Sequence, residues 1–244
     1  TLSKAFGLAG ARIGTLIASP QLRVDSGYDT NLFGSKTAPT GDGYVLGAPS
    51  IALRSDWTLH GVNLGATGTL TRYISHGRQR SNEYALHGGG HFDLGMLVVS
   101  GAASHSLISE RHGVNGAPLS VGRPSQYKST TQSMNASYDL APLLLSLSAS
   151  HEKIAYHALQ LRAGTVASQD FRDADQWSVE GKITYAPSDV AALAIRGRWQ
   201  HARAKISART NDKIEFAVSH SADVGMFRGA GTIGYLRQNF SNPQ

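Results

Sequence analysis

The fold of this chain is decided by residues 177–199, which read WSVEGKITYAPSDVAALAIRGRW. From Trp177 to Tyr185, apolar and polar residues alternate with a period of two, and the alternation resumes from Leu193 to Trp199. The Pro-Ser-Asp sequence between the two runs is typical of a turn. Alternation on both sides of a short turn predicts a β-hairpin with one apolar face and one charged face.

The same pattern recurs along the chain and predicts about eleven strands. Short turns alternate with longer polar loops, which we expect at 31–43, 110–126 and 152–175. Short turns at one end and long loops at the other are typical of outer-membrane β-barrels. The predicted strands cover residues 20–29, 45–55, 62–73, 84–94, 97–107, 134–140, 143–149, 177–185, 193–199, 214–220 and 227–235.

Aromatic residues recur at a fixed spacing on the apolar face of three predicted strands. Eight positions separate the two members of each pair, which corresponds to roughly 26 Å along a strand and to ~20 Å along the axis of a barrel with tilted strands. That height is close to the ~25 Å apolar band between the aromatic girdles of membrane barrels. A soluble sandwich would need a second apolar face to pack against. The spacing therefore favours a transmembrane barrel, with girdle residues Tyr84, Phe92, Trp177, Tyr185, Phe227 and Tyr235.

The amino-acid composition further limits the class of protein to which the chain can belong. The chain has 244 residues, 27 glycines and no cysteine, so it carries no disulfide framework, cysteine-based zinc site or thiol chemistry. It also lacks the long apolar run of a membrane helix. The net charge of +6 is not gathered into Lys/Arg runs, so we expect no nucleic-acid partner and only a weak bias towards anionic partners. Without a linker-like shift in composition, residues 1–244 are expected to form one domain.

One motif suggests chemistry but lacks its context. Residues 87–91 read His-Gly-Gly-Gly-His, which resembles an esterase oxyanion-hole motif, yet the Gly-x-Ser-x-Gly nucleophile elbow is absent. A zinc site formed with Glu83 would require a helix, which three consecutive glycines disfavour. On a strand the two histidines would lie ~13 Å apart. We therefore expect no catalytic residue, no metal and no cofactor.

The charged faces of the predicted strands should line the barrel lumen, and their charges balance. Glu180 and Lys182 face the same side as Arg196 and Arg198 on the next strand, close enough for cross-strand pairing. One interpretation is therefore a structural ion-pair ladder that braces a hydrated interior. The other is that Arg196, Arg198, Lys182 and Arg23 line a path for an anionic polymer or solute. The predicted basic residues are Arg23, Arg54, Lys182, Arg196, Arg198, Lys213 and Arg228, and the acidic residues are Asp25, Asp56, Asp93, Asp139, Glu152, Glu180 and Glu215.

Three segments carry a resemblance to a known family. They are Gly-Ala-Arg-Ile-Gly at 10–14, Pro-Gln-Leu-Arg-Val-Asp-Ser-Gly-Tyr-Asp-Thr-Asn-Leu-Phe at 20–33 and Ala-Pro-Ser-Ile-Ala-Leu-Arg-Ser-Asp-Trp at 48–57. The most specific piece is Gly-Tyr-Asp-Thr-Asn-Leu-Phe at 27–33. The three segments resemble the start of the bacterial outer-membrane β-barrel porins of type 2, most clearly over residues 10–73. The resemblance implies an all-β, antiparallel up-and-down transmembrane barrel in the bacterial outer membrane. Chains of that family are longer, so we expect an incomplete, N-terminal portion of a larger barrel.

The family is often associated with exopolysaccharide loci, which sets the functional expectation. The resemblance implies a non-enzymatic barrel with a polar lumen, embedded in outer-membrane lipid, that serves passive diffusion of small solutes or export of an anionic polysaccharide. A structural alternative is a barrel that anchors other envelope or surface proteins through its loops. An outer-membrane hydrolase is the least favoured alternative.

Overall fold

The computed structural model describes residues 2–7, 10–110, 123–161, 165–205, 210–224 and 227–240, without the side chains of residues 2–7, Val224 and Phe227. Over this part the chain forms one large antiparallel sheet in which, after its first two strands, each strand pairs with the next strand of the sheet along the chain. Its strands are β1 (Leu2–Gly7), β2 (Ala11–Ile13), β3 (Leu16–Asp29), β4 (Asp42–Ser55), β5 (His60–Tyr73), β6 (Ser81–Asp93), β7 (Leu97–Glu110), β8 (Ser125–Leu140), β9 (Leu143–Tyr156), β12 (Ala174–Ser188), β13 (Ala191–Ala204), β14 (Asn211–Val224) and β15 (Phe227–Phe240).

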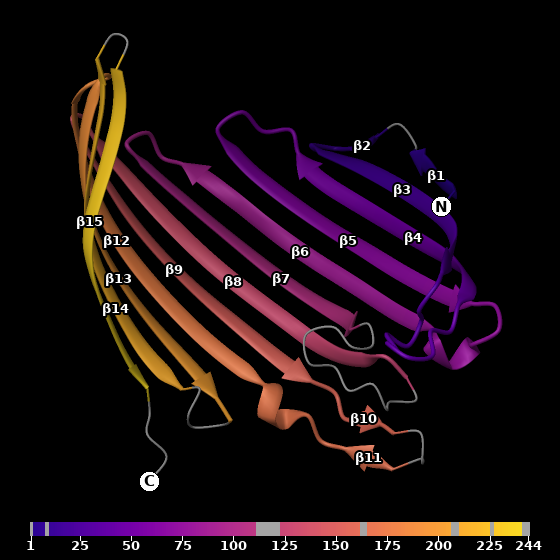
Figure 1. Ribbon diagram of the computed structural model, residues 1–244. Coiled ribbons are helices and arrows are strands. Elements are labelled where there is room, and N and C mark those ends of the chain that lie inside the picture. Colours follow the sequence, from indigo (N-terminus) through magenta and orange to yellow (C-terminus); the bar gives the residue numbers. More distant parts are fainter. Residues whose placement is uncertain are drawn as a thin grey trace.

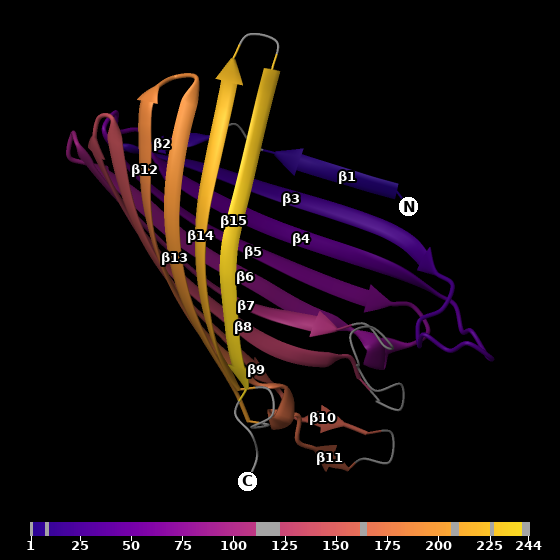
Figure 2. The ribbon, with the colours of Figure 1, turned by 60° about the vertical axis from the view of Figure 1, so that its left-hand side comes forward.

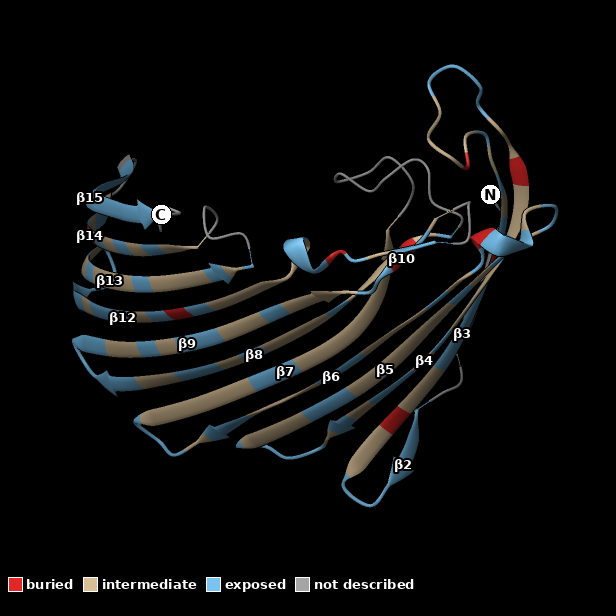
Figure 3. Ribbon diagram, turned by 90° about the horizontal axis from the view of Figure 1, so that it is seen from below, coloured by how far each residue is buried: buried red, intermediate tan, exposed pale blue. Residues whose placement is uncertain are grey.

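The sheet is a curved, open trough with a concave and a convex face (Figures 1 and 3). Short connections gather at one end, called here the turn end, and longer ones at the other, called the loop end (Figure 1). The loop end also holds two 3-10 turns, η1 (Gly77–Gln79) and η2 (Asp170–Arg172), and a small hairpin of β10 (Leu159–Gln160) and β11 (Val166–Ala167). The up-and-down antiparallel topology is as predicted.

The two edges of the sheet do not pair with each other in the described residues. One edge is β15, and the other is formed by β1 and β2, which both pair with β3 (Figure 2). The sheet is therefore not closed, in the manner of a barrel wall that has been opened along one line. The larger barrel expected from the sequence stays a prediction.

All eleven predicted strands are present, and most extend further than predicted. The clearest case is β8, which starts at Ser125 rather than at 134 and pairs with β7 along its whole length. Its first half carries Lys128, Thr130 and Gln132 on the convex face, so no apolar alternation marks it in the sequence. The two strands of the main sheet beyond the predicted eleven, β1 and β2, lie in the Gly/Ala-rich N-terminal segment, which gives no clear alternation.

The hairpin of residues 177–199 has the predicted register. Val179 lies opposite Trp199, Glu180 opposite Arg198 and Lys182 opposite Arg196, with a register shift between Tyr185 and Ser188. Directly opposed residues of antiparallel strands share a face. The apolar and charged residues of the hairpin therefore occupy opposite faces of the sheet.

The sheet has almost no internal core. Among the described residues, the only buried hydrophobic side chains are those of Ala18, Leu32, Leu159 and Ala217. Large apolar side chains instead stand exposed on the convex face, for example Leu147 at 57% and Phe216 at 57%. A continuous apolar surface of this kind is rare on soluble monomers and marks a membrane or protein contact. Among the described residues, no helix is both long enough and apolar enough to cross a membrane.

Candidate functional site

The concave face is the candidate site, because strand alternation gathers the polar side chains there. The register is continuous across the sheet, so residues opposed from strand to strand share this face: Asn63 lies opposite Gly89, and Ser133 opposite Ser150. At the loop end of the face, β3 to β7 line a cavity of about 770 Å³. Its walls include Arg23, Asp25 and Glu83.

The register places the predicted lumen residues together on the concave face. Arg23 forms an ion pair with Asp25 at 2.5 Å, and Asp25 is buried. Arg228 forms an ion pair with Asp223 at 2.5 Å near the turn end. Arg54 lies opposite Asn63, also towards the turn end. Six more predicted residues come from three adjacent strands: Glu180 and Lys182 from β12, Arg196 and Arg198 from β13, and Lys213 and Glu215 from β14. Glu152 shares the concave face in β9, and Asp56, Asp93 and Asp139 lie towards the turn end.

The ion pairs between these strands differ from the predicted ladder. Glu215 is the acceptor: it binds Arg196 and lies 3.6 Å from Lys213. Arg198 donates from Nε to Ser178 Oγ at 3.2 Å. Glu180 and Lys182 form no ion pair with any residue that the structure describes. The register explains the behaviour of Lys182: it lies directly opposite Arg196, so that two cations face each other and Arg196 turns to the next strand. Glu180 does lie opposite Arg198, but Arg198 donates to Ser178 instead.

Charge on the concave face is segregated between its two sides. The basic wall of β12 to β14 holds four cations, Lys182, Arg196, Arg198 and Lys213, against Glu180 and Glu215. The further acid of β14 on this face, Asp223, lies at the turn end and pairs with Arg228 of β15. Across the trough, the β3 to β7 side holds Asp25, Glu83 and Glu110 around the cavity. Hydroxyl and amide side chains of β8 and β9 separate the two sides, and we call them the neutral floor: Ser129, Thr131, Ser133, Asn135, Ser137, Ser146, Ser148 and Ser150. The predicted acids Asp139 and Glu152 lie on the same face of these strands. Sequence reasoning missed the neutral floor because scattered serines carry no signal until the register aligns them.

A side-chain cluster at the loop end, which we call the loop brace, was also missed by sequence reasoning. Arg172 in η2 donates to both carboxylate oxygens of Glu110 at 2.7 Å, and its guanidinium lies 4.0 Å over the Tyr156 ring. The Tyr156 ring lies 5.0 Å from the ring of Tyr127. Gln169 is fully buried and hydrogen-bonded to Ser125. Arg172 and Glu110 lie in different predicted loops, so nothing in the sequence pairs them.

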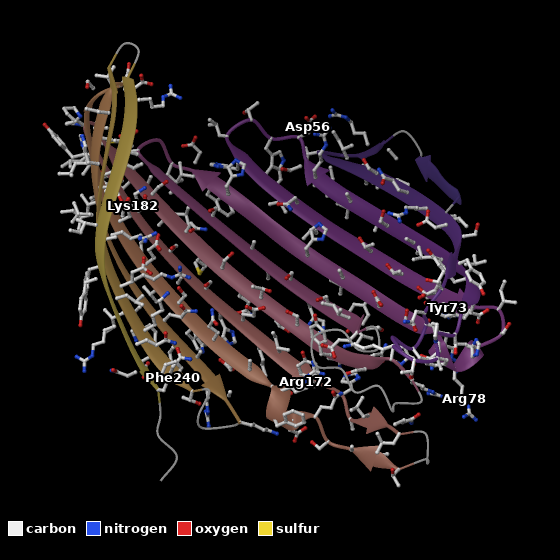
Figure 4. The ribbon with its side chains drawn as sticks, in the orientation of Figure 1. Asp56, Tyr73, Arg78, Arg172, Lys182 and Phe240 are labelled. Carbon is white, nitrogen blue, oxygen red and sulfur yellow. The ribbon has the colours of Figure 1, made fainter. Side chains whose placement is uncertain are left out.

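The loop brace fixes the connection between β9 and β12 at the end of the trough (Figure 4). Burial is the largest single influence on Arg172 and by itself would lower its pKa, but the hydrogen bonds to Glu110 together with the charge interactions with Tyr156, Glu110 and Tyr127 raise that pKa. Beside it, a hydrogen bond from Lys205 at 2.6 Å lowers the pKa of Asp170. The connection is thus held by charged contacts that all favour the ionised forms.

The predicted girdle residues share the convex face. Four of them are each more than 40% exposed there: Phe92, Trp177, Tyr185 and Tyr235. The Tyr84 hydroxyl and His105 Nε2 share a hydrogen bond of 3.2 Å. Trp177 stacks on His151 with ring centroids 4.0 Å apart. The register of β15 puts Phe227 on the same face, but its side chain lies outside the described residues.

The concave face offers polar contacts and charge to a solute. Where side chains are described, no three His, Asp or Glu residues are grouped so that they could hold a metal ion. A comparison of the sequence with curated proteins gave no significant match. A family model described as "Putative beta-barrel porin 2" matches residues 4–244, which is almost the whole chain. Together with the antiparallel up-and-down sheet, this match shows that the chain belongs to that β-barrel porin family.

Proposed function

We propose that the chain forms the wall of a non-enzymatic pore in the bacterial outer membrane, with its convex face in lipid and its concave face lining a polar passage. The proposal rests on one observation: the convex face of the sheet is apolar and the concave face is polar. The convex face exposes large apolar side chains from β3 to β15. Each Å² of such surface moved out of water contributes about 25 cal/mol, so an apolar surrounding is strongly favoured. The concave face is hydroxyl-rich and charged.

The proposed cargo is an anionic solute, and an acidic polysaccharide fits the chemistry best. The basic wall carries two more cations than acids, and Lys182 is exposed and forms no ion pair with a described residue. A row of cations on a pore wall attracts anions and raises their local concentration. The neutral floor of β8 and β9 offers hydroxyl and amide groups that exchange hydrogen bonds with sugar hydroxyls as a chain moves past.

Single-channel recording with the full native protein tests this proposal. Replacing Arg196→Ala together with Arg198→Ala should shift ion selectivity away from anions, because two of the four cations of the basic wall are removed. Arg203→Ala is the matched control, since Arg203 stands on the convex face near the loop end. Unchanged selectivity in the double variant would refute the assignment of the basic wall to anion passage.

A second candidate is supported by the loop brace. The connection between β9 and β12 is held over the loop end of the trough by Arg172 and Glu110. If this connection occludes the passage, the barrel serves to anchor a surface assembly through its loops. The same recordings separate the two roles, because an anchoring barrel inserts into the bilayer without conducting ions.

A further inference from the structure

Charged residues on the convex face occur at one end only. Over the main sheet from β3 to β15, the described Lys, Arg, Asp and Glu residues on this face all lie within three positions of the loop end of their own strand. Five are basic, and we call them the rim bases: Arg72, Lys128, Lys153, Arg203 and Arg237. Two are acidic: Asp175 and Asp212. The turn end of the same face carries none.

No rim base forms an ion pair with a described acid, whereas the two acids are already engaged with histidines. Arg72 donates hydrogen bonds to the backbone oxygens of Thr71 and Ser81 and to the side chain of Asn82. Arg237 donates to the side chain of Asn239. All five rim bases are exposed. His151 holds Asp175 at 3.0 Å, and His201 holds Asp212 at 2.8 Å. Lys128, Lys153 and Arg203 form no ion pair within the part of the chain that the structure describes. Five bases against two acids therefore leave a net positive band on the outside of the sheet.

The position of the band matches the headgroup level of a bilayer. Trp177 follows Asp175 by two positions on the same face of β12, and Tyr235 precedes Arg237 by two positions on β15. Aromatic girdles mark the boundary between the hydrocarbon and the interface. The charged positions begin just beyond these aromatics and extend over three positions, or roughly 10 Å of strand. They stand where phosphate groups of lipids lie.

We infer that the rim bases bind the phosphate groups of anionic lipids in the leaflet at the loop end. Lysine and arginine bind phosphate through charge-assisted hydrogen bonds, and basic residues at a membrane surface attract anionic lipids. The rim bases are spread over β5, β8, β9, β13 and β15 rather than gathered on two adjacent strands. Such a spread fits a surrounding ring of lipid better than a single protein partner. The inference rests on the proposed position of the chain in the membrane.

Lipid binding by the full native protein in detergent micelles, measured by native mass spectrometry, tests the inference. The probes are diphosphoryl lipid A and phosphatidylcholine. The test variant combines Lys128→Gln, Lys153→Gln and Arg203→Gln. The matched control removes the same charge from the concave face through Lys182→Gln, Arg198→Gln and Lys213→Gln. Circular dichroism establishes that both variants retain their strand content.

The native protein should bind diphosphoryl lipid A at least about tenfold more tightly than phosphatidylcholine. The rim variant should lose most of this preference and the concave control should keep it. Inorganic phosphate at the same concentration should not displace the lipid, because the lipid chains also contact the apolar face below the rim.

Equal loss in both variants, or no loss in the rim variant, would overturn the inference. A native protein that inserts into vesicles and conducts ions without preferring the phosphorylated lipid would overturn this inference and leave the pore intact. A native protein that does not insert at all would overturn both.

Discussion

Removal of the Arg172 side chain should release the connection between β9 and β12 from the end of the trough. Arg172 and Glu110 have side chains that are only 12% and 8% exposed, so their ion pair is poorly screened by water. Arg172→Ala removes two charge-assisted hydrogen bonds to Glu110, one to Gln169 and the cation–π contact with Tyr156. It also leaves the Glu110 carboxylate in a poorly hydrated place without its main cation.

The size of the effect follows from these contacts. Breaking a buried ion pair by removing one partner costs about 3–5 kcal/mol, and partial exposure argues for the lower value. A cost of about 3 kcal/mol corresponds to roughly a hundredfold increase in the equilibrium constant for local opening. The strands themselves should be unaffected, because their hydrogen-bond ladders do not involve Arg172.

Hydrogen exchange of the folded protein in detergent micelles measures this opening directly. Amide protons at residues 168–173 should exchange roughly a hundredfold faster in Arg172→Ala, and those in the middle of β8 and β9 should not change. Arg78→Ala is the control, since Arg78 is exposed in η1 at the same end of the sheet. Unchanged protection at residues 168–173, or equal loss in both variants, would refute the reasoning.

Two further predictions concern the convex face and the loop-end charges. Ile195→Lys places a charge in the middle of the exposed apolar face and should destabilise the folded protein in vesicles by ~2–4 kcal/mol. Ala194→Lys, one position away on the concave face, should cost much less; equal costs in refolding titrations would contradict the assignment of the faces. The lowered pKa of Asp170 means that its pair with Lys205 contributes fully above the ordinary aspartate pKa and is lost as the pH falls through the lowered value. The protection factors of the amide protons at η2, which correct the exchange rate for its intrinsic pH dependence, should therefore fall only in acid. A fall near neutral pH would argue against the pair.

The sequence was sufficient for the strands because a sheet with one apolar and one polar face repeats with a period of two. That signal fails where both faces are polar, as in the first half of β8, and where small residues dominate, as in β1 and β2. The alternation of side chains along each strand also assigned Lys182, Arg196 and Glu215 to one face of the sheet. It could not choose their partners, because partner choice depends on register: Lys182 faces Arg196, and Arg196 binds Glu215 instead.

The loop brace shows the other limit of sequence reasoning. Glu110 ends β7 and Arg172 lies in η2, so their contact depends on how the strands between them curve. Curvature also decides that β8 and β9 form the floor between an acidic and a basic side. Neither feature has a local sequence pattern, although both determine what the concave face can bind.

The central claim is that the concave face is wet and the convex face lies in lipid, and thiol labelling tests it most directly. The chain has no cysteine, so one introduced cysteine reports on one position. Ser133 and Met134 are neighbours in the middle of β8 and point to opposite faces, with Met134 64% exposed on the convex side. In vesicles that contain the full native protein, a membrane-impermeant thiol reagent should label Ser133→Cys and leave Met134→Cys unmodified. Equal labelling of both positions, or labelling of Met134→Cys alone, would contradict the account.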